Sequence, residues 1–466
     1  MTIPLEEYRK VIPEVFSLHP DWPLWGKVEK QMQRFSPEEW ATFKKVVRLP
    51  HVSVKPEDFG HPPKFFSLKE RFQKRERWNE WREQGKAFVQ NGTLAFLTVA
   101  GGQGTRLGVH GPKGMIPITP VKKKTLFQLF AEKILSAERA MQTEFHWFLM
   151  TSPDNHEATE NYFQQTKIFP LHRLHLFPQG DLPVFDLQGQ CLRTSTGELI
   201  FAPDGHGGVF RALHRNGCLD LMSSLNIITL SYFQIDNPLA IPLDFGFLGW
   251  HLRERAEMSS KAVRKRHPDE KMGVFVTSPE GRTKIIEYSD MPAELTQKTD
   301  SRGQPLFHLF HLGNTALHLL ERQFIERILE SGNLPFHVAR KTVLDKEGNA
   351  LPLGEPNALK LERFVFDALP LAHRSTLLEV DRREEFSPVK NATQEDSIES
   401  ARHDQVKRFK NWLERAGARI PFDDGEISCL NLEIAPSFAD EEEEFLDRWS
   451  SLSVKPEIRN PFYLAE

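Results

Sequence analysis

The strongest constraint on the fold of this chain comes from residues 93–152, where a glycine-rich loop separates a strand pattern from a helix pattern. The short apolar run LAFLTVA at 94–100 lies between glycines, which is typical of a buried strand. Residues 125–141 place apolar side chains on one helical face, and FHWFLMTS at 145–152 is a second apolar run. The order strand, loop, helix, strand predicts a βαβ unit, and therefore a parallel sheet with helices on its faces.

The flanking regions extend this prediction to the rest of the 466 residues. Residues 1–90 are polar with apolar side chains at helical spacing, and Ser36-Pro37-Glu38-Glu39 is typical of a helix start. Residues 225–236 and 272–278 predict further strands, and the segment around 430–434 predicts another. We expect a helical N-terminal region at 1–90, a catalytic domain at 91–395 and a small C-terminal domain at 396–466.

Charge and cysteine content narrow the functional classes. The formal net charge is −4, so no overall basic field draws the chain to nucleic acid or to a membrane. The three cysteines are far apart and form no CxxC pair, which favours a reducing compartment. The N-terminus has no signal-peptide pattern and no apolar run approaches a membrane span. We therefore expect a cytoplasmic protein, and the sequence leaves its oligomeric state open.

The glycine-rich loop indicates phosphate binding. Glycine lets bare backbone N–H groups approach a phosphate, and fixed cations stabilise its charge. The dinucleotide pattern GxGxxG fails because Leu107 occupies the third glycine position, and the P-loop fails because Lys113 is followed by Gly114. The alternative is a glycine turn carrying two surface cations. Four glycines and two cations after one strand favour a phosphate site, made by Gly101, Gly102, Gly104, Gly108, Arg106 and Lys113.

The string GGQGTRLG followed by GPKG resembles the signature loop of the UDP-sugar pyrophosphorylases, and in particular of the UDP-N-acetylglucosamine pyrophosphorylases. Later segments resemble the family's other motifs in the same order: APDGHGGVFRAL, YFQIDNPL, KIIEYSD, FHLGNTALH, KLERFVFDALP and EEFSPVKNA. The resemblance covers roughly residues 90–400. It implies an α/β fold with a Rossmann-like mixed sheet of the GT-A-like nucleotidyltransferase type. It also implies that UTP and a sugar 1-phosphate give a UDP-sugar and pyrophosphate.

The resemblance assigns the charged residues to the phosphates. Arg106 would hold the β- and γ-phosphates, and Lys113 the α-phosphate and leaving oxygen. Lys390 would hold the sugar phosphate, although an exposed lysine is usually only a solvated charge. Asp236 follows a predicted strand and precedes Asn237-Pro238, so the residues alone suit either a metal ligand or a turn cap. The family's metal-binding aspartate falls at Asp236, which implies Mg²⁺ or Mn²⁺.

Further residues match positions that contact the uridine and the sugar. Gln179 matches a glutamine that reads uracil, and Glu287 and Asn314 match residues that contact the sugar. The alternative for Gln179 is an ordinary surface glutamine, and for Glu287 it is a cross-strand ion-pair partner. The alternative for Asn314 is a helix N-cap before Ala316, Leu319 and Leu320. The loop Gly205-His206-Gly207 can approach the uridine or the sugar, or form only a turn, and Lys360 would serve the phosphate pocket.

Several functions remain as alternatives to an enzyme that uses N-acetylglucosamine 1-phosphate. His206 and His311 depart from the usual N-acetylglucosamine motifs, which keeps open a glucose 1-phosphate enzyme or one that accepts several sugars. A non-catalytic UDP-sugar-binding protein would lack phosphate ligands, whereas this chain retains them. A glycosyltransferase usually holds its metal with an Asp-x-Asp pair, and YFQIDNP offers one carboxylate.

Two acidic runs, Asp381–Glu385 and Asp440–Glu444, are interpreted as solvent-exposed surface: the first as a surface face and the second as a helix start.

Overall fold

The computed structural model describes residues 3–17, 23–49, 61–104, 107–109, 111–268, 270–291, 310–332, 334–342, 357–420 and 431–465. The chain forms two compact units, and each is assembled from three separate segments. The first unit comprises residues 1–53, 179–211 and 332–367, and the second comprises 54–178, 212–331 and 368–466. The three successive regions expected from the sequence stay a prediction.

The second unit is built on a nine-stranded mixed sheet in the order β10-β9-β11-β7-β1-β2-β3, in which β8 pairs with β11 and with β14. The strands are β1 (Leu94–Val99), β2 (Trp147–Thr151), β3 (Leu174–Pro178), β7 (Thr229–Gln234), β8 (Met258–Arg264), β9 (Val274–Thr277), β10 (Thr283–Ile286), β11 (Leu312–Glu321) and β14 (Ser375–Glu379). β1 is parallel to both β2 and β7, and β11 is antiparallel to β7. The predicted βαβ unit and mixed α/β sheet are therefore confirmed.

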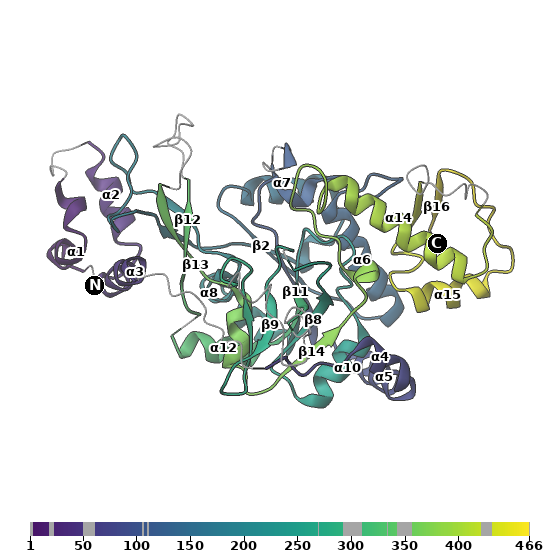
Figure 1. The fold of residues 1–466 in the computed structure, drawn as a ribbon. Helices are drawn as coiled ribbons and strands as arrows, with labels where there is room; N and C mark the ends of the chain where they lie inside the picture. The colour runs from purple at the N-terminus through teal and green to yellow at the C-terminus, as the bar shows by residue number, and fades with distance from the viewer. Residues whose placement is uncertain are drawn as a thin grey trace. The chain divides into compact units, whose positions relative to one another are not determined.

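Helices cover this sheet and bury its apolar side chains. They are α4 (Leu68–Gln73), α5 (Arg75–Gln90), α6 (Leu126–Met141), α7 (His156–Thr166), α9 (Cys218–Ser224), α10 (Phe245–Glu254), α12 (Arg322–Glu330), α13 (Arg382–Glu385), α14 (Ile398–Arg415) and α15 (Glu442–Ser451), with short 3₁₀ turns η4 (Lys113–Met115) and η5 (Leu171–Arg173). Thr125 and Gln128 form a capping box that starts α6, whose Phe127, Phe130 and Ile134 join the core beneath β1. Figure 1 shows α10 beside α4 and α5.

The last segment of the second unit carries a small apolar cluster of its own. β15 (Leu432–Ile434) pairs with β16 (Phe462–Leu464), which confirms the strand expected near 430–434. Trp412 of α14 packs against Phe445 of α15, and Phe445 stacks on Trp449. Because these rings are buried with the two short strands, the segment has its own packed interior.

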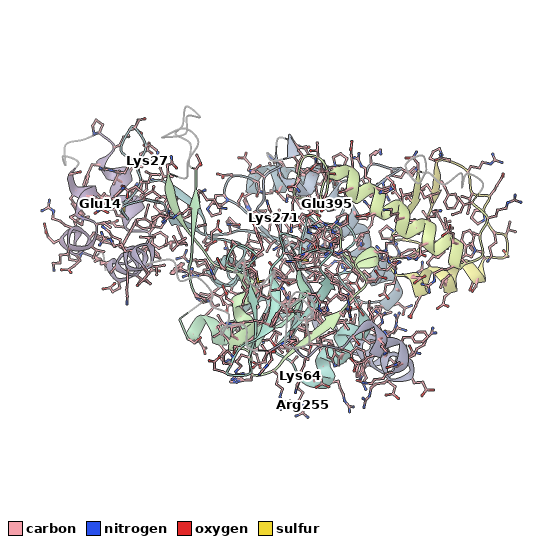
Figure 2. All side chains as sticks on the ribbon, in the orientation of Figure 1. Glu14, Lys27, Lys64, Arg255, Lys271 and Glu395 are labelled. Atoms are coloured by element: carbon pink, nitrogen blue, oxygen red, sulfur yellow. The ribbon has the colours of Figure 1, made fainter. Side chains whose placement is uncertain are left out.

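The first unit combines N-terminal helices with two small sheets. Its helices are α1 (Leu5–Val11), η1 (Pro13–Ser17), α2 (Trp25–Met32) and α3 (Pro37–Arg48), and its strands are β4 (Asp181–Pro183), β5 (Phe185–Asp186), β6 (Phe201–Pro203), β12 (His337–Lys341) and β13 (Ala358–Glu362). Ser36 and Glu39 form the capping box of α3, as the sequence predicts. Glu14, labelled in Figure 2, pairs with the buried Lys44 of α3 at 2.8 Å.

Three interpretations from the sequence fail in whole or in part. The helix N-cap that was the alternative for Asn314 is excluded, because Asn314 lies in strand β11. Glu385 is buried and pairs with Lys261, so the run at 381–385 is not simply a surface face. The run at 440–444 does begin a helix, α15, as expected, but Asp440 pairs with the buried Lys133 at 2.8 Å, so the run is not wholly solvated. In each case a partner distant in the sequence decides the structure.

Candidate functional site

The glycine-rich loop leaves the carboxyl end of β1 and is closed by its own backbone hydrogen bonds. The amide of Gly104 donates to Gly111 O at 2.9 Å, and the amide of Lys113 donates to Gly102 O at 3.1 Å. A Cβ atom at Gly104 would lie 2.8 Å from Val109 O, so this close backbone approach requires glycine. The loop is thus a compact turn that returns the chain to Lys113, at the start of η4.

Asn155 fixes the start of this loop, and the sequence analysis missed it. Its buried side chain accepts from the amide of Ser152 at 2.8 Å and donates to Ala100 O at 3.0 Å. Asn155 follows β2, whose carboxyl end lies at the same sheet edge as that of β1. That placement, a polar side chain just past a buried strand, is the signal that could have identified it.

Lys113 and Asp236 meet at the carboxyl edge of the sheet. Asp236 follows the end of β7 by two residues, and β7 is the parallel neighbour of β1. Lys113 Nζ lies 3.1 Å from Asp236 Oδ2 and donates to Val389 O at 3.1 Å. Their side chains are 17% and 14% exposed, so both retain access to solvent or to a ligand. Residues 123 positions apart therefore present a cation and a carboxylate together.

Lys390 directly follows Val389, whose carbonyl accepts the hydrogen bond from Lys113. Its side chain is exposed, and its backbone amide donates to Asp396 O at 2.6 Å. Burial raises the pKa of Asp396, and the charge of Lys390 opposes that rise. The structure thus brings the Lys390 segment to Lys113 and Asp236, whereas Arg106 lies outside the described residues.

Glu287 and Asn314, which match sugar-contacting positions, both lie against Gly273. Asn314 N donates to Gly273 O at 2.9 Å, and a Cβ atom at Gly273 would lie 3.0 Å from Glu287 Oε1. Asn314 is not a helix cap: it lies in β11, where its side chain accepts from the amide of Ala316 at 2.9 Å within an irregular part of the strand. Glu287 directly follows β10.

The remaining predicted residues belong to the first unit, and most of them form one group there. The turn η6 (His206–Gly208) lies against residues 363–365, since Gly207 N donates to Arg363 O at 2.8 Å. His206 stacks on Phe364 with ring centroids 5.2 Å apart. A Cβ atom at Gly205, which has φ of +82°, would lie 2.5 Å from Arg363 O, so glycine is required there.

Gln179 and Lys360 lie near that turn within the first unit. Gln179 is 8% exposed, and the next residue, Gly180, accepts from the amide of Asp204 at 3.2 Å. Lys360 lies on β13 and is half-buried. Burial lowers the pKa of Lys360 in spite of the nearby Glu362. Gln179, the glycine turn and the end of β13 are therefore parts of one region.

The metal ligands available near Lys113 fit a divalent cation that is bound to phosphate better than a metal that the protein holds alone. No group of three or more His, Cys, Asp or Glu side chains suited to a metal ion occurs among the described residues. Mg²⁺ typically takes one or two carboxylates and completes its shell with phosphate oxygens and water. Asp236 can supply such a carboxylate, so the residues present fit Mg²⁺ or Mn²⁺ carried by a nucleotide.

A mixed α/β sheet whose carboxyl edge carries a glycine loop, a lysine and a carboxylate has the architecture of the nucleotide-binding α/β class, whose members bind ligands at that edge. A family model described as UTP–glucose-1-phosphate uridylyltransferase matches residues 64–414. The chain belongs to this family of uridylyltransferases and is an enzyme.

Individual relatives agree with this assignment. The chain is 36% identical over 358 residues to a UDP-N-acetylglucosamine pyrophosphorylase of Saccharomyces cerevisiae, with 73% of this chain and 74% of the relative covered. It is 33% identical to UDP-N-acetylglucosamine diphosphorylase 2 of Arabidopsis thaliana, with 81% and 78% covered. Its fold matches a crystal structure of the Trypanosoma brucei UDP-N-acetylglucosamine pyrophosphorylase with TM-score 0.74 and 26% identity, covering 88% of this chain and 86% of the other.

Across the part of the chain that the structure describes, every helix falls short of the length or the apolarity needed to cross a membrane.

Proposed function

We propose that this enzyme transfers UMP from UTP to N-acetylglucosamine 1-phosphate and releases pyrophosphate. The observation that carries the choice of sugar is the set of relatives at 33–36% identity that are named for N-acetylglucosamine. Glucose 1-phosphate, or a broad range of sugars, is the second candidate, because the family model is described by glucose 1-phosphate and His206 departs from the usual N-acetylglucosamine loop.

The proposed chemistry is a direct, in-line displacement. An oxygen of the sugar phosphate attacks the α-phosphorus of UTP, and pyrophosphate leaves from the opposite side. No side chain needs to form a covalent bond, so the protein acts by positioning and by neutralising charge. The proximity of Lys113, Asp236 and the Lys390 segment supports this mechanism, because two anionic substrates must meet there.

Each charged residue has a distinct proposed role. Lys113 neutralises the α-phosphate and the leaving oxygen, and Arg106 contacts the β- and γ-phosphates. Lys390 holds the sugar phosphate. Asp236 would hold Mg²⁺ or Mn²⁺, which supplies positive charge to the phosphates when bound.

The sugar and base contacts are proposed for the other predicted residues. Glu287 and Asn314, which flank Gly273, contact the sugar hydroxyls and the N-acetyl group. Gln179 reads the uracil edge because an amide can both donate and accept. Gly101, Gly102 and Gly104 present backbone to the nucleotide, and Gly205, His206, Gly207 and Lys360 contact the substrates. Cytoplasmic location also stays a prediction.

A substrate panel tests the proposed function. Purified protein would be given UTP with N-acetylglucosamine, N-acetylgalactosamine, glucose or galactose 1-phosphate, and pyrophosphate release would be measured with and without Mg²⁺. We expect the highest kcat/KM with N-acetylglucosamine 1-phosphate and loss of turnover when the metal is chelated. A higher kcat/KM with glucose 1-phosphate would select the second candidate, and UDP-sugar binding without turnover would refute catalysis.

A lysine variant tests the assignment of charge within the site. Removing one preorganised charge commonly raises a barrier by about 2–4 kcal/mol, so Lys113→Ala should lower kcat about a hundredfold or more. Lys86→Ala is a matched control, because Lys86 pairs with Glu83 at the surface of α5. A near-normal kcat in Lys113→Ala would exclude its proposed role.

A further inference from the structure

One buried amide joins the Asp236 turn to the segment that carries Lys390. Asn237 is 4% exposed, and its Nδ2 donates to Glu385 O at 2.7 Å while its Oδ1 accepts from Ser387 N at 2.9 Å. These are the two hydrogen bonds that a neighbouring strand would make, supplied here by one side chain. Asn237 thus binds the backbone of a segment that lies 148–150 residues away in the sequence.

Further bonds continue this attachment toward Lys390. The amide of Val389 donates to Asp236 O at 2.8 Å, and Val389 O accepts from Lys113 Nζ at 3.1 Å. The Ser387 hydroxyl lies 2.7 Å from Asp404 Oδ2, which ties the middle of the segment to α14. Residues 385–389 are therefore held along their length, and Lys390 extends from the fixed end.

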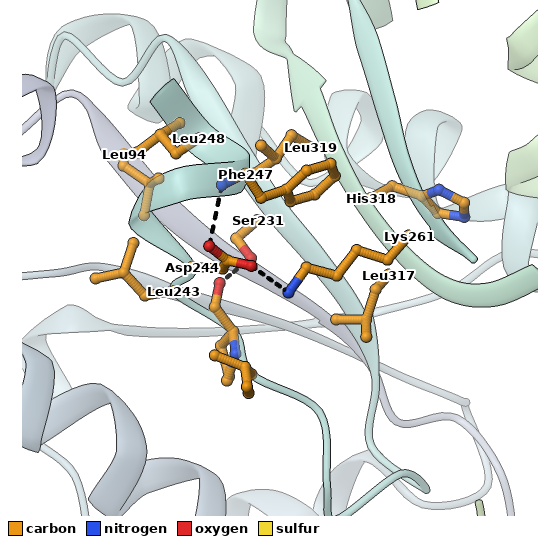
Figure 3. A pocket seen from close by; sticks show the side chains of 12 residues that line it. Leu94, Ser231, Leu243, Asp244, Phe247, Leu248, Lys261, Leu317, His318 and Leu319 are labelled. Atoms are coloured by element: carbon orange, nitrogen blue, oxygen red, sulfur yellow. Dashed lines mark hydrogen bonds and ion pairs between the residues drawn. The ribbon is translucent and has the colours of Figure 1, made fainter. Parts of the chain in front are cut away.

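The start of the segment is anchored by buried charge. Lys261 of β8 is 1% exposed and contacts Glu385 Oε2 at 2.5 Å and Asp244 Oδ2 at 2.8 Å. Figure 3 shows Lys261 reaching Asp244 among apolar side chains such as Phe247 and Leu317. Because ions in such surroundings are costly to separate, Glu385 is a firm end point for the segment.

We propose that Asn237 is a positioning residue that holds Lys390 at a fixed place relative to Asp236. Lys390 is proposed to hold the sugar phosphate, so this inference rests on the proposed function. Asn237 touches neither substrate in this scheme and acts only through the segment 385–390. An amide suits this role because it both donates and accepts, whereas a carboxylate only accepts and a methyl group does neither.

The first test compares activities of single and double variants. Asn237→Asp keeps the acceptor for Ser387 N and loses the donor to Glu385 O, and Asn237→Ala loses both. Because a displacement of about 1 Å in a catalytic group can cost about a hundredfold, we expect kcat to fall about 10- to 100-fold. In a Lys390→Ala background either change should cost less than about threefold, since the group that it positions is gone.

The second test measures hydrogen exchange of the backbone amides of Ser387 and Val389 in the substrate-free protein. Asn237→Ala should increase their exchange about tenfold or more, whereas amides of β1 should be unchanged. Asn216→Ala is a matched control, since the Asn216 side chain also donates to backbone carbonyls, but on α8 (Val209–Arg215) and at Pro178. It should leave both activity and the exchange of residues 387–389 as in the wild type.

The two tests separate this inference from the proposed function. Absence of wild-type turnover with every sugar phosphate would refute the proposed function, while exchange would still decide whether Asn237 holds the segment. Unchanged exchange at residues 387–389 in Asn237→Ala would overturn the inference. The inference would also be overturned if the fold-losses in kcat of the Asn237 and Lys390 single variants multiplied in the double variant, as independent effects do. Faster exchange at residues 387–389 in Asn237→Ala, together with a double variant that loses less kcat than the product of the single losses, would support the inference.

Discussion

Replacing Lys261 with methionine should destabilise the fold strongly, because the change leaves two buried carboxylates without their shared cation. The side chains of Lys261, Asp244 and Glu385 are 1%, 6% and 5% exposed. Removing one partner of a buried ion pair typically costs about 3–5 kcal/mol, because the remaining charge stays buried without compensation. We therefore expect Lys261→Met to lower the free energy of unfolding by about 3–5 kcal/mol near pH 7.

The loss should depend on pH in a definite direction. Burial and repulsion from Asp244 raise the pKa of Glu385 against the attraction of Lys261. Burial would also raise the pKa of Asp244, but Lys261 and then Arg71 outweigh it, so that this pKa lies below its ordinary range. Without Lys261 we expect the pKa of both groups to rise. Both would then bind protons more tightly in the folded state, so the destabilisation should shrink as pH falls toward about 5.

Urea unfolding of wild type and Lys261→Met at pH 7 and about pH 5 measures both effects. A triple variant that adds Asp244→Asn and Glu385→Gln removes the buried charges together, and the amide introduced at position 244 would keep an oxygen able to accept from Phe247 N at the start of α10. Its unfolding free energy should return to within about 1–2 kcal/mol of the wild type. A loss of under about 1 kcal/mol in Lys261→Met, or a loss that grows on acidification, would refute the reasoning.

Three further outcomes follow from buried contacts elsewhere. Asn155→Ala should raise the KM for UTP several-fold in steady-state assays, because the glycine loop loses its bond at Ala100 O; an unchanged KM would contradict this. Glu433→Ala should lower stability to urea by about 1.5–3 kcal/mol, because Glu433 Oε2 accepts two backbone amides at 2.7 Å; equal midpoints would contradict it. Burial raises the pKa of Cys218 to about 11, and burial followed by the charge of Glu14 raises the pKa of Cys191, so both thiols should resist alkylation at pH 8 until urea unfolds the chain.

Local pattern was enough to predict the βαβ unit and the glycine loop. The apolar run at β1 and the helical spacing of α6 are dictated by residues close in the sequence, and the capping boxes at Ser36 and Thr125 are complete within four residues. Asp236 and Lys113 were also predictable as neighbours. Asp236 follows β7, the loop that carries Lys113 follows β1, and these parallel strands end at the same edge of the sheet.

The division into two units could not be predicted in this way. The first unit takes residues 179–211 and 332–367 from the middle of the chain and packs them with N-terminal helices. For example, Leu182 and Leu361 share an apolar cluster with Trp40. The chain passes from one unit to the other within helix α8 at 211/212 and within the 3₁₀ segment Val365–Leu371 at 367/368, so no break in local structure marks these two crossings.

Asn314 shows why local propensity failed in part of the site. An asparagine before Ala316, Leu319 and Leu320 has the composition of a helix start, yet β7 and β8 pair with this segment on its two sides. The strand is irregular between Asn314 and His318, and Ala316 has φ of +58°. Pairing with two strands therefore outweighs helix propensity, and the irregularity leaves Asn314 bonded to Gly273 beside Glu287.

The two acidic runs were misjudged for a related reason. An acidic run is solvated unless a distant residue supplies a cation, and the sequence gives no distance between Glu385 and Lys261 or between Asp440 and Lys133. Both lysines are nearly fully buried, which is tolerated only because each meets a carboxylate. Glu385 also begins the segment that ends at Lys390. The buried Lys261–Glu385 pair therefore also bears on the proposed site, because it gives the exposed Lys390 a fixed point from which to extend.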